Sequence, residues 1–501
     1  MLPQPHLTSL DLVVLIGYFL AVLAVGFAFW KRSRSVDGFT VASRGLPGWL
    51  TGLSILGTYV SSISFVALPG KAFGGNWNSF VFSLSIPLAA WIAVRWFLPF
   101  YRESGTTSAY THLEQRFGPW ARIYASACYL LTQLARIGTV TYLMALPMQV
   151  LLGWNIGMII IVTGIVTTLY TFVGGIVGVI WTDAIQTIVL MAGALACALI
   201  MVFSLPGGWG QLVELANAGD KFSLGSFGGS LTESTFWVVL IYGLFINLQN
   251  FGVDQNYVQR YHTSRSDREA RKSIWMGGLL YVPLSALFFF IGTALFAYYS
   301  VHPGALPPEY RGQGDLVFPW FIVSVLPSGV TGLLVASVFA AAMSTISSSL
   351  NSTATIVLDD YYLRFVRPGA DERQKMRLLH VTTAVIGVLG TVMALAMINV
   401  KSALDAWWSL AGIFSGGMLG LFLLGFISRQ ARSAGALTGV AAGVLIILWM
   451  SLSPRWEGEL ARWSSPFHGF LTIVFGTAAI LLVGLLITGL FKNSEQPREG
   501  T

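Results

Sequence analysis

Charged residues are scarce in this chain of 501 residues. Lys, Arg, Asp and Glu together make up 10% of the sequence, whereas hydrophobic residues make up 55%. A typical soluble domain carries about 25% charged residues. The chain therefore lacks the side chains that would cover a water-soluble fold, and its solvent is expected to be largely lipid.

Cysteine and the usual motifs of enzymes are scarce too. The two cysteines, Cys128 and Cys197, both lie inside apolar runs, which excludes a disulfide framework and a cysteine-based metal site. The sequence shows no phosphate-binding glycine loop, no His/Cys metal spacing and no pairing of a nucleophile with a base. We therefore expect neither an enzyme, nor a transition metal, nor an organic cofactor.

Long apolar runs are abundant, by contrast. About 20 apolar helical residues cross a bilayer core of about 30 Å. The first run is preceded by no basic residue and followed by Lys31 and Arg32, which is the wrong polarity for a cleaved signal peptide. Thirteen candidate spans lie near residues 10–30, 48–70, 79–100, 121–150, 155–175, 180–204, 235–254, 274–299, 320–350, 377–398, 404–427, 434–452 and 467–490.

The positive charges predict the orientation. Of the 29 Lys and Arg residues, 21 fall in or beside the loops of one side, and six fall on the other side. Basic loops stay in the cytoplasm, so we expect a multi-pass protein of the cell (inner) membrane with its N-terminus outside the cell and its C-terminus in the cytoplasm. This bias accounts for the net charge of +7 without a nucleic-acid partner. The longest external stretch, 205–233, is rich in Gly and Ser and is expected to be a loop.

Polar residues interrupt the span at 48–70. Its middle reads GTYVSSIS, from Gly57 to Ser64. The hydroxyl groups there can form hydrogen bonds with backbone groups that lose their helical partners where the helix is interrupted. Broken helices of this kind form binding sites near the midplane of secondary transporters. Packing of small residues, with serines bonded to their own helix, is the alternative interpretation.

A second hydroxyl cluster closes the span at 320–350. Ser344, Ser347 and Ser348 share one helical face, and Thr345 lies beside Ser348. A hard cation such as Na+ prefers oxygen ligands, and hydroxyl groups bind it without adding a full negative charge. The cluster therefore favours a site for Na+ as a coupling ion.

Two charged residues fall in or at the edge of spans. Arg136 lies in the middle of 121–150, where an unpaired arginine is costly. It could pair with an acid such as Asp183 or Glu233, or bind the carboxylate of a small solute. Asp183 opens the span at 180–204 and could also be a helix cap.

The span at 235–254 carries a polar stripe that continues to residue 260. Phe245 and Asn247 lie deep enough to face a solute, whereas the part from Asp254 to Arg260 is expected to face the cytoplasm. Five spans in 48–204 and five in 235–427 would form two repeats of opposite orientation, each opening with a polar-interrupted helix. Residues 10–30 and 434–490 would be accessory helices of a single transporter domain, 1–501.

Several motifs resemble the sodium:solute symporter family, and among its members the bacterial sialic acid symporters. They are TYVSSISFVALPGKAF, TSAYTHLEQRFG, LYTFVGGIVGVIWTDAIQ, VDQNYVQRY and FAAAMSTISSSLNS. The resemblance implies an all-α membrane protein with the leucine-transporter fold and an extra N-terminal helix. It also implies two sodium sites. The first consists of the carbonyls of Gly57, Val60 and Ala341 and the hydroxyls of Ser344 and Thr345; the second consists of Asp183, Ser344, Ser347 and Ser348.

The same resemblance implies the solute contacts. They are Ser61, Ser64, Ser83 and Arg136, with Tyr59 where threonine is expected and Ser83 where glutamine is expected. We therefore expect sodium-coupled import of a small polar solute, a carboxylate such as sialic acid or a related sugar acid, by alternating access. The alternatives are a neutral sugar, an amino acid or a monocarboxylate as solute, or a sodium channel or receptor on the same fold.

Overall fold

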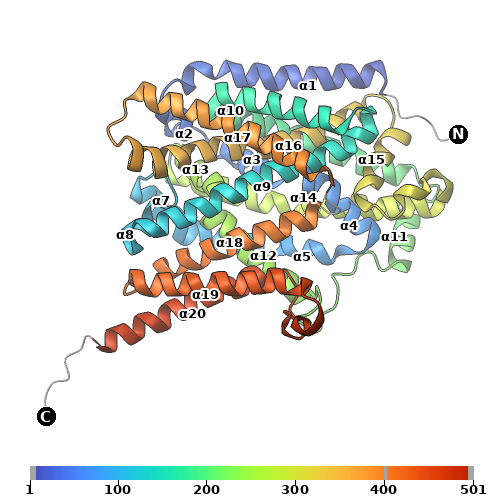
Figure 1. The fold of residues 1–501 in the computed structure, drawn as a ribbon. Coiled ribbons are helices and arrows are strands. Elements are labelled where there is room, and N and C mark those ends of the chain that lie inside the picture. Colours follow the sequence, from blue (N-terminus) through green and yellow to red (C-terminus); the bar gives the residue numbers. More distant parts are fainter. Residues whose placement is uncertain (1–6, 400–402, 495–501) are drawn as a thin grey trace, which may run out of the picture.

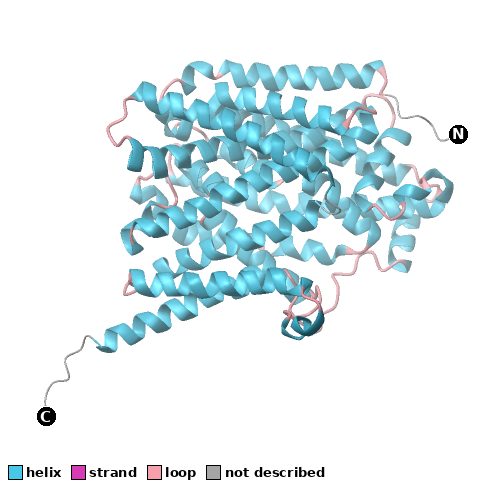
Figure 2. Cartoon of the chain, in the orientation of Figure 1, coloured by secondary structure: helices cyan, strands magenta, loops and turns pink. Residues whose placement is uncertain are grey.

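The structure is a computed structural model that describes residues 7–399 and 403–494. Within these ranges the chain is almost wholly helical and has no strand, apart from one isolated bridge between Leu46 and Ser264. Figure 2 shows helices joined by short loops. The predicted all-α class is confirmed.

The helices follow one another along the whole described chain. The first ten α-helices are α1 (Ser9–Ala28), α2 (Val36–Val41), α3 (Gly48–Tyr59), α4 (Leu68–Gly74), α5 (Val81–Leu84), α6 (Ile86–Ile92), α7 (Leu98–Ser104), α8 (Thr111–Phe117), α9 (Pro119–Leu152) and α10 (Ile156–Phe203). The other ten are α11 (Gly208–Ala218), α12 (Phe236–Gly252), α13 (Gln255–Thr263), α14 (Asp267–Val301), α15 (Gly314–Ser324), α16 (Val330–Ile356), α17 (Glu372–Ala396), α18 (Ala403–Ile427), α19 (Ser433–Leu452) and α20 (Leu471–Ser494). Three π-helical segments adjoin them, namely η3 (Ile63–Ala67), η5 (Ala93–Phe97) and η8 (Val357–Val366).

The apolar helices are numerous enough for a multi-pass membrane protein. Among the described residues, nine helices are long and apolar enough to cross a bilayer, or up to eleven when each of two bent pairs counts as one span. All thirteen predicted segments overlap helices, but the number of crossings stays a prediction. The predicted span at 320–350 is divided between α15 and α16.

The predicted spans 155–175 and 180–204 imply a loop at 176–179, which is wrong because α10 runs through these residues. The backbone breaks its helical geometry at Gly175 instead, where φ is +50°. A side chain there would be strained, and its Cβ would lie 2.8 Å from Cδ2 of Phe39. Glycine thus lets one long helix turn without an intervening loop.

Two helices are broken near the middle of the bundle. α3 gives way at Val60, which is extended (φ −81°, ψ 117°), and the chain resumes through η3 and α4 at 61° to α3. α12 and α13 meet at 45°, and Asp254 caps the start of α13. The second break therefore lies after the predicted interruption around Asn247, which is helical, because the capping carboxylate starts a new helix.

The stretch 205–233 is not entirely a loop, contrary to the prediction. It contains α11, whose residues Leu212 and Ala216, four positions apart, are buried on one helical face. The many glycines around this helix concealed its apolar face in the sequence.

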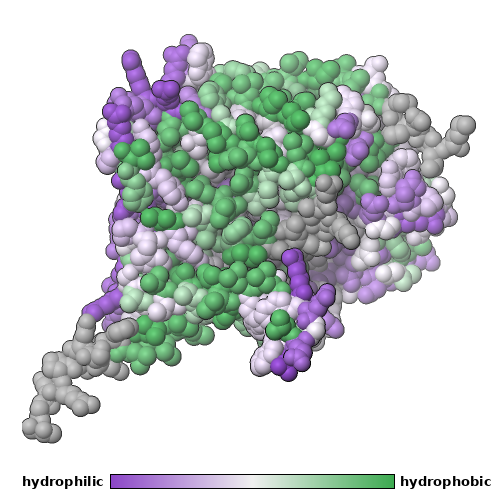
Figure 3. Space-filling model, viewed as in Figure 1, coloured by the Kyte–Doolittle hydropathy of each residue, from purple (hydrophilic) through white to green (hydrophobic). Residues whose placement is uncertain are grey.

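The helices run roughly side by side between two ends of the bundle. Figure 1 shows α7, α8 and α13 towards one end and α4, α11 and α15 towards the other. The start of α1 and the end of α20 lie at opposite ends. Figure 3 shows hydrophobic residues over the lateral face and hydrophilic residues gathered towards the ends, as expected for a belt that faces lipid.

The N-terminal helix is tied to α16 by a single carboxylate. Asp11 forms a capping box with Thr8 at the start of α1. Its Oδ1 also accepts hydrogen bonds from the backbone amides of Gly329 (2.7 Å) and Gly332 (2.8 Å), at the start of α16. These amides belong to the orphan donors of a helix start, so the contact caps α1 and α16 at once.

Candidate functional site

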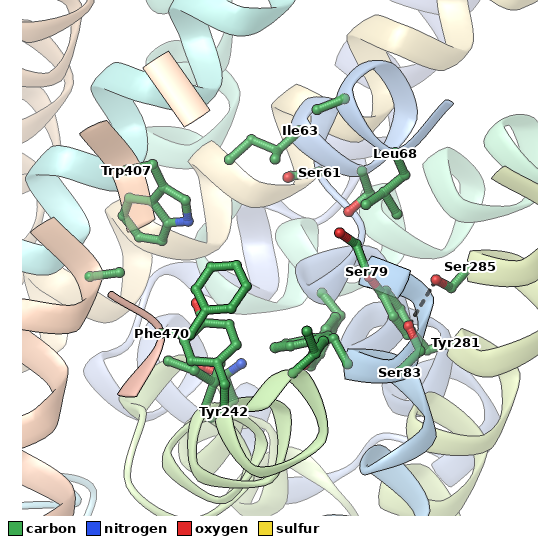
Figure 4. A pocket seen from close by; sticks show the side chains of 18 of the residues that line it. Ser61, Ile63, Leu68, Ser79, Ser83, Tyr242, Tyr281, Ser285, Trp407 and Phe470 are labelled. Carbon is green, nitrogen blue, oxygen red and sulfur yellow. Dashed lines mark hydrogen bonds between the residues drawn. The ribbon is translucent and has the colours of Figure 1, made fainter. Parts of the chain in front are cut away.

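A cavity of about 1240 Å³, including its open mouth, lies between the two broken helices. Its walls come from η3, α4, α5, α9, α12, α14 and α18 (Figure 4). Hydroxyl and amide groups line it together with three charged residues, Lys71, Arg136 and Asp254. The wall reaches the exposed Lys71, whereas Asp254, at the junction of α12 and α13, is 3% exposed. Such a pocket, with a few convergent polar groups, suits a small polar solute.

Arg136 links the cavity to the first broken helix. Its Nη2 donates a hydrogen bond to the carbonyl of Thr58 (2.8 Å), in the last turn of α3. Carbonyls at a helix end lack intrahelical donors and carry partial negative charge, so a guanidinium stabilises the broken end. Among the described residues Arg136 forms no ion pair, so neither suggested acid, Asp183 or Glu233, pairs with it, and Asp183 has another partner.

The serines that were expected to contact solute do line the cavity. They are Ser61, Ser64 and Ser83, of which Ser83 also donates a hydrogen bond to Ser285 (2.8 Å; Figure 4). Phe245 and Asn247 are not among the lining residues.

Asn247 lies behind the cavity wall. It is fully buried, it accepts a hydrogen bond from the Tyr59 hydroxyl, and its Nδ2 donates to Ser85 Oγ (2.9 Å). Asn247 thus holds Tyr59, which itself lines the cavity, and its own amide is engaged on both sides.

The outer wall of the cavity is aromatic. Phe470, from the segment between α19 and α20, stacks on Tyr242 of α12 with ring centroids 4.5 Å apart. Trp407 of α18 lies on the same side, across the cavity from Ser83 and Ser285 (Figure 4). The C-terminal helices therefore contribute to the cavity, which the sequence did not indicate.

Ser344 connects α16 to the broken end of α3 at the first expected sodium site. Ser344 Oγ of α16 donates to the carbonyl of Gly57 (2.9 Å), and Thr345 Oγ1 donates to the carbonyl of Ala341 (3.2 Å). Val60 supplies the extended residue of the break. Gly57 must lack a side chain, since a Cβ would lie 2.5 Å from Thr187 Oγ1 of α10.

Asp183, the acid of the second expected sodium site, is paired with Arg260. Arg260 Nη2 lies 2.8 Å from Asp183 Oδ2, and both side chains are 0% exposed. The same Nη2 donates to Ser348 Oγ (2.6 Å), while Ser347 Oγ donates to the carbonyl of Ser344 (3.1 Å). Because Asp183 lies well inside α10, its interpretation as a helix cap is wrong.

One oxygen of that carboxylate is left without a partner. Asp183 Oδ1 is buried and meets no hydrogen-bond donor in the described part of the chain. Gln186, one turn further along α10, is buried as well, beside the hydroxyls of Tyr18 and Tyr170. Buried polar atoms are seldom left unsatisfied, so the bare carboxylate oxygen of Asp183 suits a ligand such as a cation.

The polar segment from Asp254 to Arg260 is buried, and its expected cytoplasmic exposure is wrong. Asn256 donates to Gln133 Oε1 (3.1 Å) and accepts from Ser352 (2.6 Å), while Gln259 donates to Asn351 Oδ1 (2.9 Å). Positive-inside counting assigned Arg260 to a loop. The sequence did contain a signal for the buried position of Arg260: Asp183 falls at the edge of an apolar span, and a buried acid requires a cation nearby.

Ion pairs hold together the end of the bundle that carries α8. Arg122 of α9 donates to Asp360 Oδ1 of η8 (2.9 Å) and to Glu114 of α8 (3.0 Å), and Arg364 pairs with Glu114 too. Burial acts to raise the pKa of Glu114, but the hydrogen bonds from both arginines outweigh it and hold the pKa below its ordinary value. These contacts close the molecule on the side away from Lys71.

Comparison with known proteins agrees with this geometry. Residues 39–443 match the sequence profile of the Sodium:solute symporter family. The chain belongs to the sodium:solute symporter family. The family match and the apolar helices make it a multi-pass protein of the inner membrane, and the relatives described below are symporters, not enzymes.

Relatives named as sialic acid symporters cover nearly the whole chain. The sodium/sialic acid symporter NanT of Aliivibrio fischeri is 36% identical over 97% of this chain and 94% of its own. The sodium/sialic acid symporter SiaT of Proteus mirabilis is 33% identical over 97% and 96%. A solved Na+-coupled sialic acid symporter, described as substrate-bound and outward-open, matches with a TM-score of 0.89, 31% identity and coverage of 97% and 98%.

Proposed function

We propose that the chain is a sodium-coupled symporter that imports a small anionic solute, an acidic sugar such as sialic acid, by alternating access. The observation that carries the proposal is the bond from Arg136 to Thr58. Thr58 follows Gly57, whose carbonyl lies 2.9 Å from Ser344 Oγ in the first sodium site. One broken helix thus holds both the solute anchor and the ion ligands, so that ion and solute stabilise the same conformation.

Two sodium sites accompany the solute in this proposal. The first consists of the carbonyls of Gly57, Val60 and Ala341 with the hydroxyls of Ser344 and Thr345. The second consists of Asp183, Ser344, Ser347 and Ser348. The unpartnered Oδ1 of Asp183 supports the second site, because a buried carboxylate oxygen beside hydroxyl groups is a favourable ligand for a hard cation.

The charges of the cavity support an anion. Two cations, Lys71 and Arg136, and one acid, Asp254, line it. A guanidinium binds a carboxylate through two parallel hydrogen bonds, which a neutral sugar does not offer. The choice of sialic acid rests on the names of the relatives. At Tyr59 and Ser83 the cavity departs from the pattern expected of sialic acid symporters, which has threonine and glutamine there.

The proposed topology has thirteen crossings, with the N-terminus outside. Two bent pairs, α3 with α4 and α12 with α13, open the two proposed repeats, 48–204 and 235–427. A single transporter domain contains both repeats, and α1, α19 and α20 are accessory to them. The opposite positions of α1's start and α20's end support an odd number of crossings.

The conformation corresponds to the outward-facing step of the cycle. The cavity reaches Lys71 at the end that carries α4, while the other end is closed by the contacts of Arg260 and Arg122. Sodium would bind from outside and stabilise this state, and solute would follow. Opening of the inner end would then release both into the cytoplasm.

Uptake into proteoliposomes tests the proposal. We expect an inward sodium gradient to drive uptake of labelled sialic acid, measured against a neutral sugar, an amino acid and a monocarboxylate. Replacing both hydroxyls, Ser344→Ala with Thr345→Ala, should raise the half-saturating sodium concentration at least about tenfold, or about 1.4 kcal/mol. Ser337→Ala removes another α16 hydroxyl, which bonds to Val189 away from the ion ligands, and should leave it unchanged. Uptake that does not need sodium would refute the proposal.

A further inference from the structure

Arg260 joins four helices at one buried point. It extends from α13, and its Nε donates to Ser54 Oγ of α3 (2.8 Å), while Nη1 donates to the carbonyl of Asn256 in its own helix (2.7 Å). Its Nη2 contacts Asp183 of α10 and Ser348 of α16. Three nitrogens of the guanidinium are thus fixed, and the side chain is 0% exposed.

The arginine divides the Asp183 carboxylate into two unequal oxygens. Oδ2 accepts from Arg260 (2.8 Å) and from Ser54 (2.6 Å). Oδ1 receives no hydrogen bond from any described residue, although it is buried. Because a carboxylate readily accepts several hydrogen bonds, one bare oxygen marks the side on which something else binds.

A fixed positive charge next to a cation site weakens that site. Arg260 already compensates the charge of Asp183 and holds Ser348 Oγ, which is another ligand of the second sodium site. A sodium ion at Oδ1 would therefore meet a carboxylate shared with a guanidinium, and would feel the repulsion of that guanidinium in a poorly screened interior. Once sodium leaves, Arg260 still neutralises the acid, which would otherwise be costly to bury.

We propose that Arg260 is a positioning residue that presents Oδ1 of Asp183 to sodium and keeps the second site weak enough to release its ion inside. The proposal rests on the proposed function, since it assigns a role to a residue beside its second sodium site. Arg260 would also neutralise Asp183 after sodium has left, so that the empty carrier can return without an unpaired buried acid. The alternative role of Arg260 is to hold four helices together without affecting the ion.

Sodium binding to purified protein separates these roles. Arg260→Gln keeps hydrogen-bonding capacity but removes the charge. We expect this variant to bind sodium about tenfold more tightly, as measured by tryptophan fluorescence or calorimetry. Arg260→Lys should restore weak binding because it restores the charge. Arg265→Gln is the matched control, since it removes a positive charge from a side chain that is 62% exposed, and sodium affinity should not change.

The transport cycle gives a second measurement. Tighter sodium should slow release, so net uptake by Arg260→Gln should fall at least about fivefold. Exchange of labelled for unlabelled solute, with sodium saturating on both sides, does not require that release and should persist. The double variant Asp183→Asn with Arg260→Gln removes both charges and should lose the tight site, which shows that the gain depends on Asp183.

Two results overturn the inference. One is a sodium affinity in Arg260→Gln that equals or falls below that of the wild-type protein, although an unchanged melting temperature shows that the variant is folded. The other is an equal loss of net uptake and exchange. If the wild-type protein itself binds no sodium or transports without it, the proposed function fails instead, so the two failures are distinguishable.

Discussion

Arg136 has two duties that one side chain can fulfil at once. It caps the broken end of α3 through Thr58, and it presents its remaining donors to the cavity. A lysine would supply charge without the planar fork that fits a carboxylate, so the two residues are not interchangeable here. The effect of substitution therefore depends on whether the solute carries a carboxylate.

For Arg136→Ala we expect the KM for the acidic solute to rise at least about 30-fold, since losing one partner of a buried charged pair costs about 2 kcal/mol or more. Uptake of the solute's methyl ester provides the matched comparison. The ester should be a poor solute for the wild-type protein and should lose little more in Arg136→Ala, because the pair is already broken. Equal losses for acid and ester would mean that Arg136 only caps α3.

At the scale of elements, the accessory hairpin of α19 and α20 reaches the cavity. His468, beside Phe470, donates its backbone amide to the carbonyl of Leu231 (2.9 Å), which fixes the segment against the loop between α11 and α12. Phe470 then stacks on Tyr242 of the second broken helix. A segment outside both proposed repeats thus contributes to the cavity.

In Phe470→Ala we expect the solute KM to rise about fivefold, because an aromatic contact contributes about 1 kcal/mol. Sodium affinity measured without solute should stay the same. The control is Phe467→Ala in the same segment, whose ring packs on Phe475 at 4.8 Å and does not line the cavity. If both variants raise KM alike, the segment acts on the fold and Phe470 makes no specific contribution.

Helices and hydroxyl clusters were accessible to sequence reasoning, whereas pairings between distant elements were not. The serines from Ser344 to Ser348 are visible because such a cluster has no place in an ordinary apolar span. Arg260 was hidden because a basic residue near a span end is normally cytoplasmic. Its partner Asp183 lies 77 residues earlier, and only the approach of α13 to α10 brings them together.

The same limit explains why Asn247, expected to contact solute, does not line the cavity. Asn247 is polar and lies within an apolar span, which is typical of a binding residue. The fold instead directs it to Tyr59 and Ser85, behind the cavity. The same polar residue types face a cavity and support its wall from behind. Which of the two a residue does depends on how its helix is rotated, and the sequence does not show that.

At the scale of the whole molecule, the two proposed sodium sites determine how steeply solute can be concentrated. With a tenfold gradient and 100 mV, two sodium ions supply about 7.4 kcal/mol, and importing one anion opposes this by about 2.3 kcal/mol. About 5 kcal/mol remains, which corresponds to between three and four decades of accumulation.

We expect transport by the wild-type protein to move one net positive charge per cycle and to accelerate when the inside is made negative. Asp183→Asn should remove one ion, so the sodium Hill slope falls towards one and uptake of a monovalent anion no longer depends on the membrane potential. Asp220→Asn is the control, because this exposed residue has a φ of +52° that asparagine tolerates. A potential-dependent Asp183→Asn would contradict the second site.

The bond from Asp11 to the start of α16 has a consequence for the order of assembly. Its partner amides, Gly329 and Gly332, are synthesised 318 and 321 residues later than the carboxylate. While the ribosome makes the intervening chain, Asp11 keeps its capping contacts with Thr8, but its Oδ1 lacks these two later donors, and a carboxylate oxygen without donors is costly to bury. α1 is therefore expected to stay beside the growing bundle and to dock only after α16 has been inserted.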